Sequence, residues 1–217
     1  MQSTTDTATA PIKIKICGLR RAKDIDLVNA TQPDYIGFVF AKSKRQVNFE
    51  TALALKKRLD PAIQAVGVFV NHDMDKLFAL LDAKVIDVVQ LHGGEPEEII
   101  CAIKSAYPAI PIIKAVSVRT AEDILTWANS SADYLLLDNG AGGTGKPFDW
   151  AVLPQITALT KPYFIAGGLT PQNIATVLPF APFGVDVSGG VEDTQTGYKD
   201  PAKVAALIQT VRKEMNG

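Results

Sequence analysis

One unit recurs along most of this chain: a short apolar stretch, a polar or glycine-rich loop, and then a segment with helical spacing. Strands are predicted at 12–17, 35–40, 65–70, 88–92, 112–116, 134–138, 163–166 and 185–188. Helices are predicted near 21–30, 49–59, 74–82, 96–106, 120–129, 150–159, 171–178 and 201–214. Strands that alternate with helices in eight units predict an α/β fold, a single closed parallel (β/α)8 TIM barrel.

An open doubly wound sheet is disfavoured because no G-x-G-x-x-G follows the first strand. Two helix starts carry capping chemistry. Thr170 and Asp200 each precede a proline, and we predict that they cap the helices at 171–178 and 201–214.

Bulk properties place the chain among ordinary globular proteins. Its 217 residues suit one barrel domain, assigned to 12–217, and the small polar residues 1–11 predict a disordered N-terminal tail. A formal net charge of -1 gives no reason to expect nucleic acid or an anionic membrane as partner. No apolar run reaches the roughly 20 residues of a membrane span, and no signal peptide is recognisable, so we expect a cytoplasmic protein. Two cysteines and two histidines form no disulfide framework and no zinc motif.

The first strand has an unusual polar face. Strict alternation places Ile12, Ile14 and Ile16 on one side and Lys13, Lys15 and Cys17 on the other. Cys17 ends the strand, where barrel enzymes carry catalytic groups. A lone cysteine is more often a small packing residue, and its pKa of about 8.5 leaves little thiolate at neutral pH. Lys15 could raise that fraction.

Lys15 could instead form a structural pair with Asp186, because strands one and eight are neighbours in a closed barrel. An interior lysine needs such a partner. We therefore predict that this pair lies inside the barrel.

Asp138 ends the sixth strand after four apolar or aromatic residues. Such a carboxylate is either a cap for the next loop or a general acid whose pKa is raised by burial. With Cys17 at the same mouth, we favour the acid. His92 ends strand four on the same face as Gln90, so it either points inward to support the site or makes a loop hydrogen bond.

Two glycine-rich turns, Gly167-Gly168 and Ser188-Gly189-Gly190, follow strands seven and eight. These are the usual phosphate-binding positions of such barrels, because backbone N–H groups can approach an anion there. The alternative is that the glycines only serve tight turns.

The loop 141–150 is predicted to be a lid. Three cations lie in the segment 41–45, where Arg45 could bind a second anion or simply be solvated.

Short motifs follow one another along nearly the whole chain after the tail. They are Lys15-Ile-Cys-Gly-Leu19, Gly37-Phe-Val-Phe40, Val66-Gly-Val-Phe-Val-Asn71, Val89-Gln-Leu-His-Gly93, Leu136-Leu-Asp138, Gly142-Gly-Thr-Gly-Lys146 with Phe148-Asp-Trp150, Gly167-Gly-Leu-Thr-Pro-Gln-Asn173 and Val185-Asp-Val-Ser188. In this order, they resemble the phosphoribosylanthranilate isomerase family. Any one motif is modest, but the ordered set is highly specific.

The resemblance implies an isomerase of tryptophan biosynthesis that performs an Amadori rearrangement of N-(5-phosphoribosyl)anthranilate without metal or cofactor. It implies Cys17 as general base, Asp138 as general acid and Arg45 as the ligand of the anthranilate carboxylate. It implies that the phosphate binds at Gly167, Gly168, Ser188, Gly189 and Gly190. Gln90, His92, Lys15 and Asp186 would support these groups. The expected partner is a small phosphorylated substrate, and the expected state is a monomer or weak homodimer.

Two departures from the family pattern stand out. Gly189 replaces the second serine of a Ser-Ser-Gly turn, which removes a hydroxyl, and the loop that carries Lys44 and Arg45 is shorter than in some relatives. The second departure leaves open which cation contacts the carboxylate, and Arg45 is preferred.

Three rival functions remain. An indole-glycerol-phosphate synthase needs a catalytic lysine with a glutamate partner, and the candidate Lys114 has no matching glutamate in the sequence. A pentose-phosphate epimerase needs metal-binding histidines, of which the chain has too few. A non-catalytic binder of phosphorylated ligands is disfavoured by Cys17 and Asp138.

Overall fold

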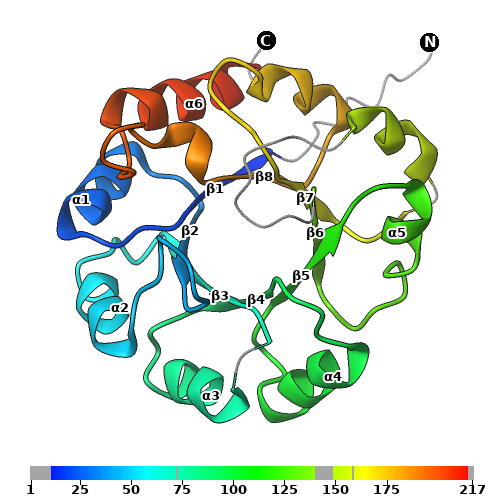
Figure 1. The fold of residues 1–217 in the computed structure, drawn as a ribbon, viewed down its shortest axis with the longest axis horizontal. Helices are drawn as coiled ribbons and strands as arrows, with labels where there is room; N and C mark the ends of the chain where they lie inside the picture. The colour runs from blue at the N-terminus through cyan, green and yellow to red at the C-terminus, as the bar shows by residue number, and fades with distance from the viewer. Residues whose placement is uncertain (1–10, 72, 140–148, 158, 215–217) are drawn as a thin grey trace, which may run out of the picture.

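The strands hydrogen-bond in sequence order and the last pairs with the first, so the sheet closes into a barrel (Figure 1). A computed structural model describes residues 11–71, 73–139, 149–157 and 159–214. The parallel strands are β1 (Lys13–Cys17), β2 (Tyr35–Val39), β3 (Gln64–Phe69), β4 (Val88–Leu91), β5 (Ile112–Ser117), β6 (Tyr134–Asp138), β7 (Tyr163–Ile165) and β8 (Gly184–Val187). The prediction of a (β/α)8 barrel is confirmed.

An outer ring of helices surrounds the barrel (Figure 1). The α-helices are α1 (Ala22–Thr31), α2 (Phe49–Lys56), α3 (Met74–Asp82), α4 (Glu97–Ala106), α5 (Ala121–Leu125) and α6 (Pro201–Glu214). Short 3₁₀ helices complete the ring: η1 (Trp150–Ile156), η2 (Ile174–Thr176), η3 (Leu178–Phe180) and η4 (Gly189–Val191). The predicted cap of the last helix is confirmed, because the Asp200 carboxylate accepts a hydrogen bond from the Lys203 N–H at 3.0 Å.

Two predicted helices are not α-helices. The segment 150–156 is 3₁₀ with Pro154 inside it, and a proline there removes the N–H that an α-helix needs. After β7 the chain makes a turn, followed by η2 and η3. Thr170 does not cap a helix; instead its N–H donates to the Asn173 side chain, which also donates to the Gly168 carbonyl at 3.0 Å. The Asn173 side chain thereby closes the turn in place of a helical first turn.

Alternation along each strand divides the core into two layers. Ile14 and Ile16 face outward into the layer between the strands and helices. Cys17 faces inward, in a cluster with residues such as Val66 and Leu136. The split predicted for the first strand is therefore confirmed, and it follows from the two-residue period of a strand.

The barrel interior also holds a buried ion pair. Lys15 and Asp186 are register partners on β1 and β8, and their side chains meet at 3.0 Å. The Lys15 side chain is 0% exposed and that of Asp186 is 9% exposed. The predicted pairing is confirmed.

Most of the predicted tail and lid lies outside the described residues: of 1–11 only Pro11 is described, and of 141–150 only Asp149 and Trp150. Within the described part of the chain, no helix is long and apolar enough to cross a membrane.

Candidate active site

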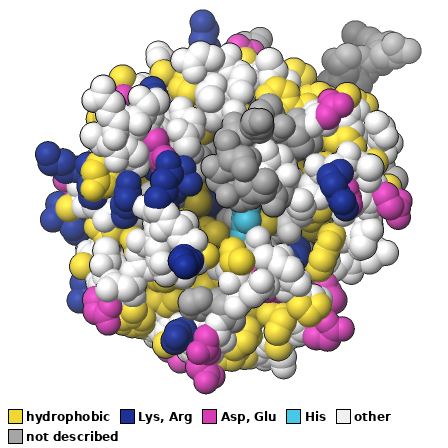
Figure 2. Space-filling view, viewed as in Figure 1, with side chains coloured by type: hydrophobic (Ala, Val, Ile, Leu, Met, Phe, Trp, Pro, Cys, Tyr) yellow, Lys and Arg dark blue, Asp and Glu magenta, His cyan; other side chains and the backbone are white. Residues whose placement is uncertain are grey.

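A cavity of about 600 Å³ opens at the carboxyl ends of the strands. All of the site residues predicted from the sequence except Lys15 line it. These are Cys17, Arg45, Gln90, His92, Asp138, Gly167, Gly168, Asp186, Ser188, Gly189 and Gly190. Lys and Arg side chains gather on the side of the mouth over α1, β1 and β2 (Figure 2). The barrel therefore brings together residues that are up to 173 positions apart in the sequence, Cys17 and Gly190 (190 − 17).

The Cys17 thiol projects from the end of β1 into this cavity and is 7% exposed. Its neighbour on β2 is Gly37, where a Cβ would lie only 2.6 Å from the Cys17 sulfur. Only a residue without a side chain leaves room for the thiol at this register position. Burial raises the pKa of the Cys17 thiol above its ordinary value; Lys15 opposes this and Asp186 adds to it. Lys15 does favour the thiolate, as expected, but burial and the Asp186 charge outweigh it.

Asp138 lies across the mouth at the end of β6, with its side chain 15% exposed. Its two carboxylate oxygens accept hydrogen bonds from different donors. One bonds the Asn139 N–H at 2.7 Å, and the other lies 3.2 Å from His92 Nε2. Burial alone would raise the pKa of Asp138, but His92, the Asn139 N–H and Lys15 together hold it below its ordinary value. The prediction of a raised pKa is wrong, because the sequence did not reveal the donors around the carboxylate.

Gln90 and His92 continue this hydrogen-bonded chain into the barrel. His92 Nδ1 lies 2.8 Å from Gln90 Nε2, so both ring nitrogens have partners. Of the two alternatives for His92, the inward orientation is therefore the one observed. The Gln90 side chain is 1% exposed, and its Oε1 has no hydrogen-bond partner among the described residues.

The two glycine turns pack against each other. A Cβ on Gly190 would lie 1.9 Å from the Leu169 carbonyl oxygen, so no larger residue fits there without a backbone shift. Gly167 and Gly168 both have positive φ, at 78° and 67°. Within the described part of the chain, neither of their N–H groups donates to a protein acceptor. Gly167 and Gly168 thus line the cavity with backbone donors that no protein acceptor uses.

The Ser188 hydroxyl is already engaged. It donates to the Cys17 carbonyl at 3.0 Å, which ties the turn after β8 to the end of β1. The Ser188 hydroxyl proton is therefore already used within the protein.

Arg45 reaches the cavity, but its guanidinium already binds a carboxylate. Arg45 Nε lies 2.6 Å from Glu192 Oε1, and Arg45 Nη2 lies 3.0 Å from Glu192 Oε2. Lys199 Nζ also contacts Glu192 at 3.0 Å. Burial would raise the pKa of Glu192, but Arg45 and Lys199 lower it to about 2. Lys44 is 63% exposed and lies 3.4 Å from Glu192. The structure therefore favours Arg45 over Lys44 as the cation held at the mouth.

Two residues of this cluster, Glu192 and Lys199, are not predicted from the sequence. No local pattern separates Glu192 from Asp193 beside it, yet Glu192 is 5% exposed whereas Asp193 is partly open to solvent. Their pairing depends on the path of the chain between η4 and α6, which only the tertiary structure reveals.

The prediction that Lys114 lacks a glutamate partner, which was made against a rival function, is wrong. Lys114 does have a glutamate partner, because Glu95 Oε2 lies 3.2 Å from its Nζ. The Lys114 ammonium also donates to the Gly93 carbonyl and lies over the Trp127 ring. Lys114 alternates with the inward-facing Ile113 on β5, so it points away from the cavity and does not line it. Its direction, rather than the lack of a partner, argues against a catalytic lysine.

Among the described residues, no group of three or more His, Cys, Asp or Glu side chains is arranged to hold a metal ion.

Comparisons with known proteins agree with this geometry. The family model described as N-(5'phosphoribosyl)anthranilate (PRA) isomerase matches residues 14–210. A relative from Endomicrobium trichonymphae, named N-(5'-phosphoribosyl)anthranilate isomerase, is 44% identical over 205 residues, covering 92% of this chain and 98% of the relative. The crystal structure of phosphoribosyl anthranilate isomerase from Thermus thermophilus is 31% identical with a TM-score of 0.84, over 94% of this chain and 100% of that one.

A second solved structure is a phosphoribosyl anthranilate isomerase in complex with reduced 1-(o-carboxyphenylamino)-1-deoxyribulose 5-phosphate. It is 31% identical, with a TM-score of 0.81, over 93% of this chain and 99% of that one. The family model and the relative each cover most of the sequence, and the barrel mouth carries the residues that the motifs indicate. The chain belongs to the N-(5'-phosphoribosyl)anthranilate isomerase family.

Proposed function

We propose that this chain is the isomerase of tryptophan biosynthesis that rearranges N-(5'-phosphoribosyl)anthranilate, with Cys17 as its general base and Asp138 as its general acid. The observation that carries this proposal is that a thiol on β1 and a carboxylate on β6 line one cavity. These strands are not neighbours in the barrel, so the two groups can act on opposite sides of one bound sugar.

The residue types suit an Amadori rearrangement. Asp138 gives a proton to the furanose ring oxygen as the C1–O bond breaks, and the ring opens to a Schiff-base cation. The cation acidifies the proton on C2, so a thiolate is a sufficient base. Cys17 removes that proton, and the electron pair moves to the cationic nitrogen to form an enolamine. Tautomerisation of the enolamine gives the ketone.

Anion-binding groups at the mouth support the same reaction. The unused N–H groups of Gly167 and Gly168, with the turn Ser188-Gly189-Gly190, would bind the 5'-phosphate. Arg45 would bind the anthranilate carboxylate. Anchoring both anions would fix the sugar between acid and base, which is how binding energy lowers a barrier by positioning. We also expect the chain to work as a monomer or weak homodimer in the cytoplasm.

Gln90 and His92 offer a route for loading the acid. In the observed orientation, Gln90 Nε2 donates to His92 Nδ1, and His92 Nε2 donates to an ionised Asp138. Turning the Gln90 amide over would let its partnerless Oε1 accept from a proton on Nδ1. Nε2 would then accept a hydrogen bond from a protonated Asp138. On His92 and Asp138 together, the second arrangement holds one more proton than the first. The Cys17 thiol gives up that proton as it becomes the thiolate, and the reaction then uses it.

The pH profile tests this proton arrangement. The resting pair, a Cys17 thiol and an Asp138 carboxylate, holds one proton, and so does the working pair of thiolate and carboxylic acid. The pKa of Cys17 is raised and that of Asp138 is lowered. The pair therefore keeps one proton at every pH between these two pKa values. We expect kcat/KM to stay level from about pH 6 to 8 and to fall only above the ordinary thiol pKa of about 8.5, because burial raises the pKa at which the Cys17 thiol ionises.

The ultraviolet absorbance of the Cys17 thiolate, taken as the difference between wild type and Cys17→Ala, should then appear only on the falling limb. An activity that instead rose below pH 8 in step with the thiolate signal would contradict the arrangement.

Rescue of a tryptophan auxotroph that lacks the isomerase tests the function itself. The wild-type gene should restore growth without tryptophan, and failure of well-expressed protein to do so would overturn the proposal. Titration of the purified protein with the reduced product analogue identifies the rival, because a non-catalytic binder would bind that ligand but give no turnover.

A further inference from the structure

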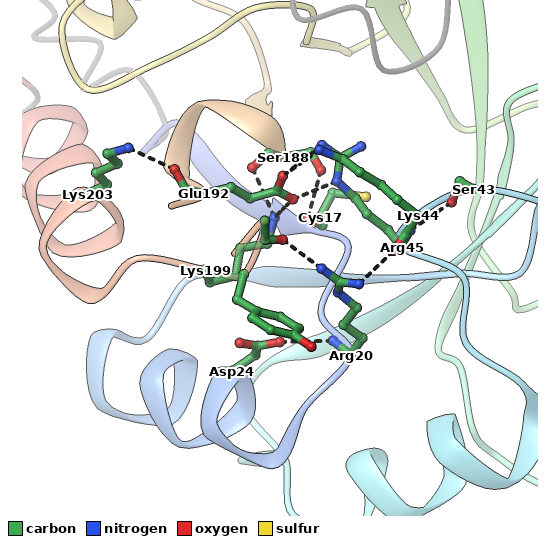
Figure 3. A network of polar contacts seen from close by, with 12 residues as sticks. Cys17, Arg20, Asp24, Ser43, Lys44, Arg45, Ser188, Glu192, Lys199 and Lys203 are labelled. Carbon is green, nitrogen blue, oxygen red and sulfur yellow. Dashed lines mark hydrogen bonds and ion pairs between the residues drawn. The ribbon is translucent and has the colours of Figure 1, made fainter. Parts of the chain in front are cut away.

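A buried carboxylate, that of Glu192, is at the centre of the polar network shown in Figure 3. Its Oε1 accepts from Arg45 Nε at 2.6 Å and from Lys199 Nζ at 3.0 Å. Its Oε2 accepts from Arg45 Nη2 at 3.0 Å. Ion pairs of this depth contribute little net stability, because removing the charges from water offsets their attraction. Their value is more often in the geometry that they impose.

The geometry imposed here concerns the guanidinium of Arg45. Glu192 binds the edge formed by Nε and Nη2 in a two-pronged contact. A guanidinium is planar and has five N–H donors, so fixing one edge also fixes the direction of the other. Among the described residues, Nη1 has no acceptor and Nη2 has only Glu192, so the N–H groups that face the second edge, between Nη1 and Nη2, are not used. Arg45 lines the cavity, so this second edge is suited to a ligand carboxylate.

The Arg45 side chain is also enclosed along its length. A Cβ on Gly18 would lie 2.5 Å from Arg45 Cδ, and a Cβ on Gly189 would lie 3.2 Å from Arg45 Nη2. The side chain therefore runs between the turn after β1 and the turn after β8. Lys199, which shares Glu192 with Arg45, also donates to the Ser188 carbonyl at 3.0 Å. Arg45 is thus held next to both the thiol strand and the proposed phosphate turn.

The charges of the network leave it ready for a second anion. Two cations share one carboxylate. Both are largely buried, with side chains that are 12% exposed in Arg45 and 1% exposed in Lys199. Lys44 adds a third positive charge at 3.4 Å. Glu192 neutralises enough charge for Arg45 to be held at the mouth, and the remaining positive charge attracts an anionic ligand.

We infer that Glu192 is a positioning residue that aims the Nη1–Nη2 edge of Arg45 at the aromatic carboxylate of the substrate. The inference rests on the proposed role of Arg45. Ordering the long Arg45 side chain costs conformational entropy. Because Glu192 orders it before the ligand arrives, the binding step does not include that cost, and the effect is limited to ligands that carry the carboxylate.

The experiment compares two ligands by calorimetry. One is the reduced product analogue with its o-carboxyphenyl group, and the other is the same molecule with an unsubstituted phenyl group. In Glu192→Gln, one oxygen remains for Arg45 Nε and Lys199, while the contact to Nη2 is lost. We expect this variant to bind the carboxylate-bearing ligand roughly ten- to a hundredfold more weakly. The phenyl ligand should bind within about twofold of wild type.

Arg45→Ala completes a double-mutant cycle. If both residues act through one contact, adding Glu192→Gln to Arg45→Ala should cause no further loss of selectivity between the two ligands. A Glu192→Gln variant that weakens both ligands equally, or neither, would overturn the inference. Arg45→Ala with unchanged selectivity would instead overturn the proposed role of Arg45, so the two failures are distinguishable.

Two controls keep the test interpretable. Asp34→Asn makes the same change in an ion pair with Lys13 on β1, outside the cavity, and should leave the binding of both ligands unchanged. Should Glu192→Gln fail to fold because Lys199 loses its charge partner, the double variant Glu192→Gln/Lys199→Met removes the buried cation. That double variant should show the same selective loss.

Discussion

Replacing Cys17 with alanine is expected to lower kcat by about 10²- to 10⁴-fold, the usual contribution of a general base. The thiol lies in the cavity beside a glycine that leaves room for it, and its removal takes away the group proposed to accept the C2 proton. KM should change little, because the proposed anion-binding groups remain. Steady-state kinetics on the purified variant, with the folded state checked by circular dichroism, measures this directly.

Cys101→Ala is the matched control, because Cys101 is the second cysteine of the chain and lies exposed on α4. It should retain wild-type activity. Full activity in Cys17→Ala would show that another group is the base. Asp138→Asn should also lower kcat strongly, since an amide can still contact His92 but cannot supply the proton.

Lys15→Met is expected to destabilise the fold by about 3–5 kcal/mol and to lower Tm by roughly 6–20 °C. The reason is that Asp186, with its side chain 9% exposed, would keep a charge inside the barrel with its lysine partner gone. Urea and thermal unfolding, followed by circular dichroism, report both quantities.

Lys13→Met tests whether the effect comes from burial. Lys13 is on the same strand and pairs with Asp34 at 2.8 Å, but their side chains are 37% and 31% exposed. Its loss should cost less than about 1 kcal/mol. The double variant Lys15→Met/Asp186→Leu, which removes both charges, should recover most of the stability. A Lys15→Met protein as stable as wild type would contradict a structural role for the pair.

The fold could be read from the sequence because its signals are local and repeat. Each strand is a short apolar run whose period of two assigns its faces, and each is followed by a segment with helical spacing. The same period predicted the inward face of Cys17 and Lys15, and adjacency of the first and last strands predicted Asp186 as partner. The segments 150–159 and 171–178 were misread, because Pro154 and the Asn173 turn override helical spacing.

Local patterns along the chain are enough to predict the barrel, the strand ends that carry Cys17 and Asp138, and the glycine turns near the proposed phosphate site. The electrostatics around these groups depends on which residues folding brings next to them. Whether a buried carboxyl holds or loses its proton depends on the donors that surround it, and His92 reaches Asp138 from a different strand. Glu192 was not recognised for the same reason. A charged residue acquires a role only when folding surrounds it with partners from distant parts of the chain, and no local pattern in the sequence records those partners.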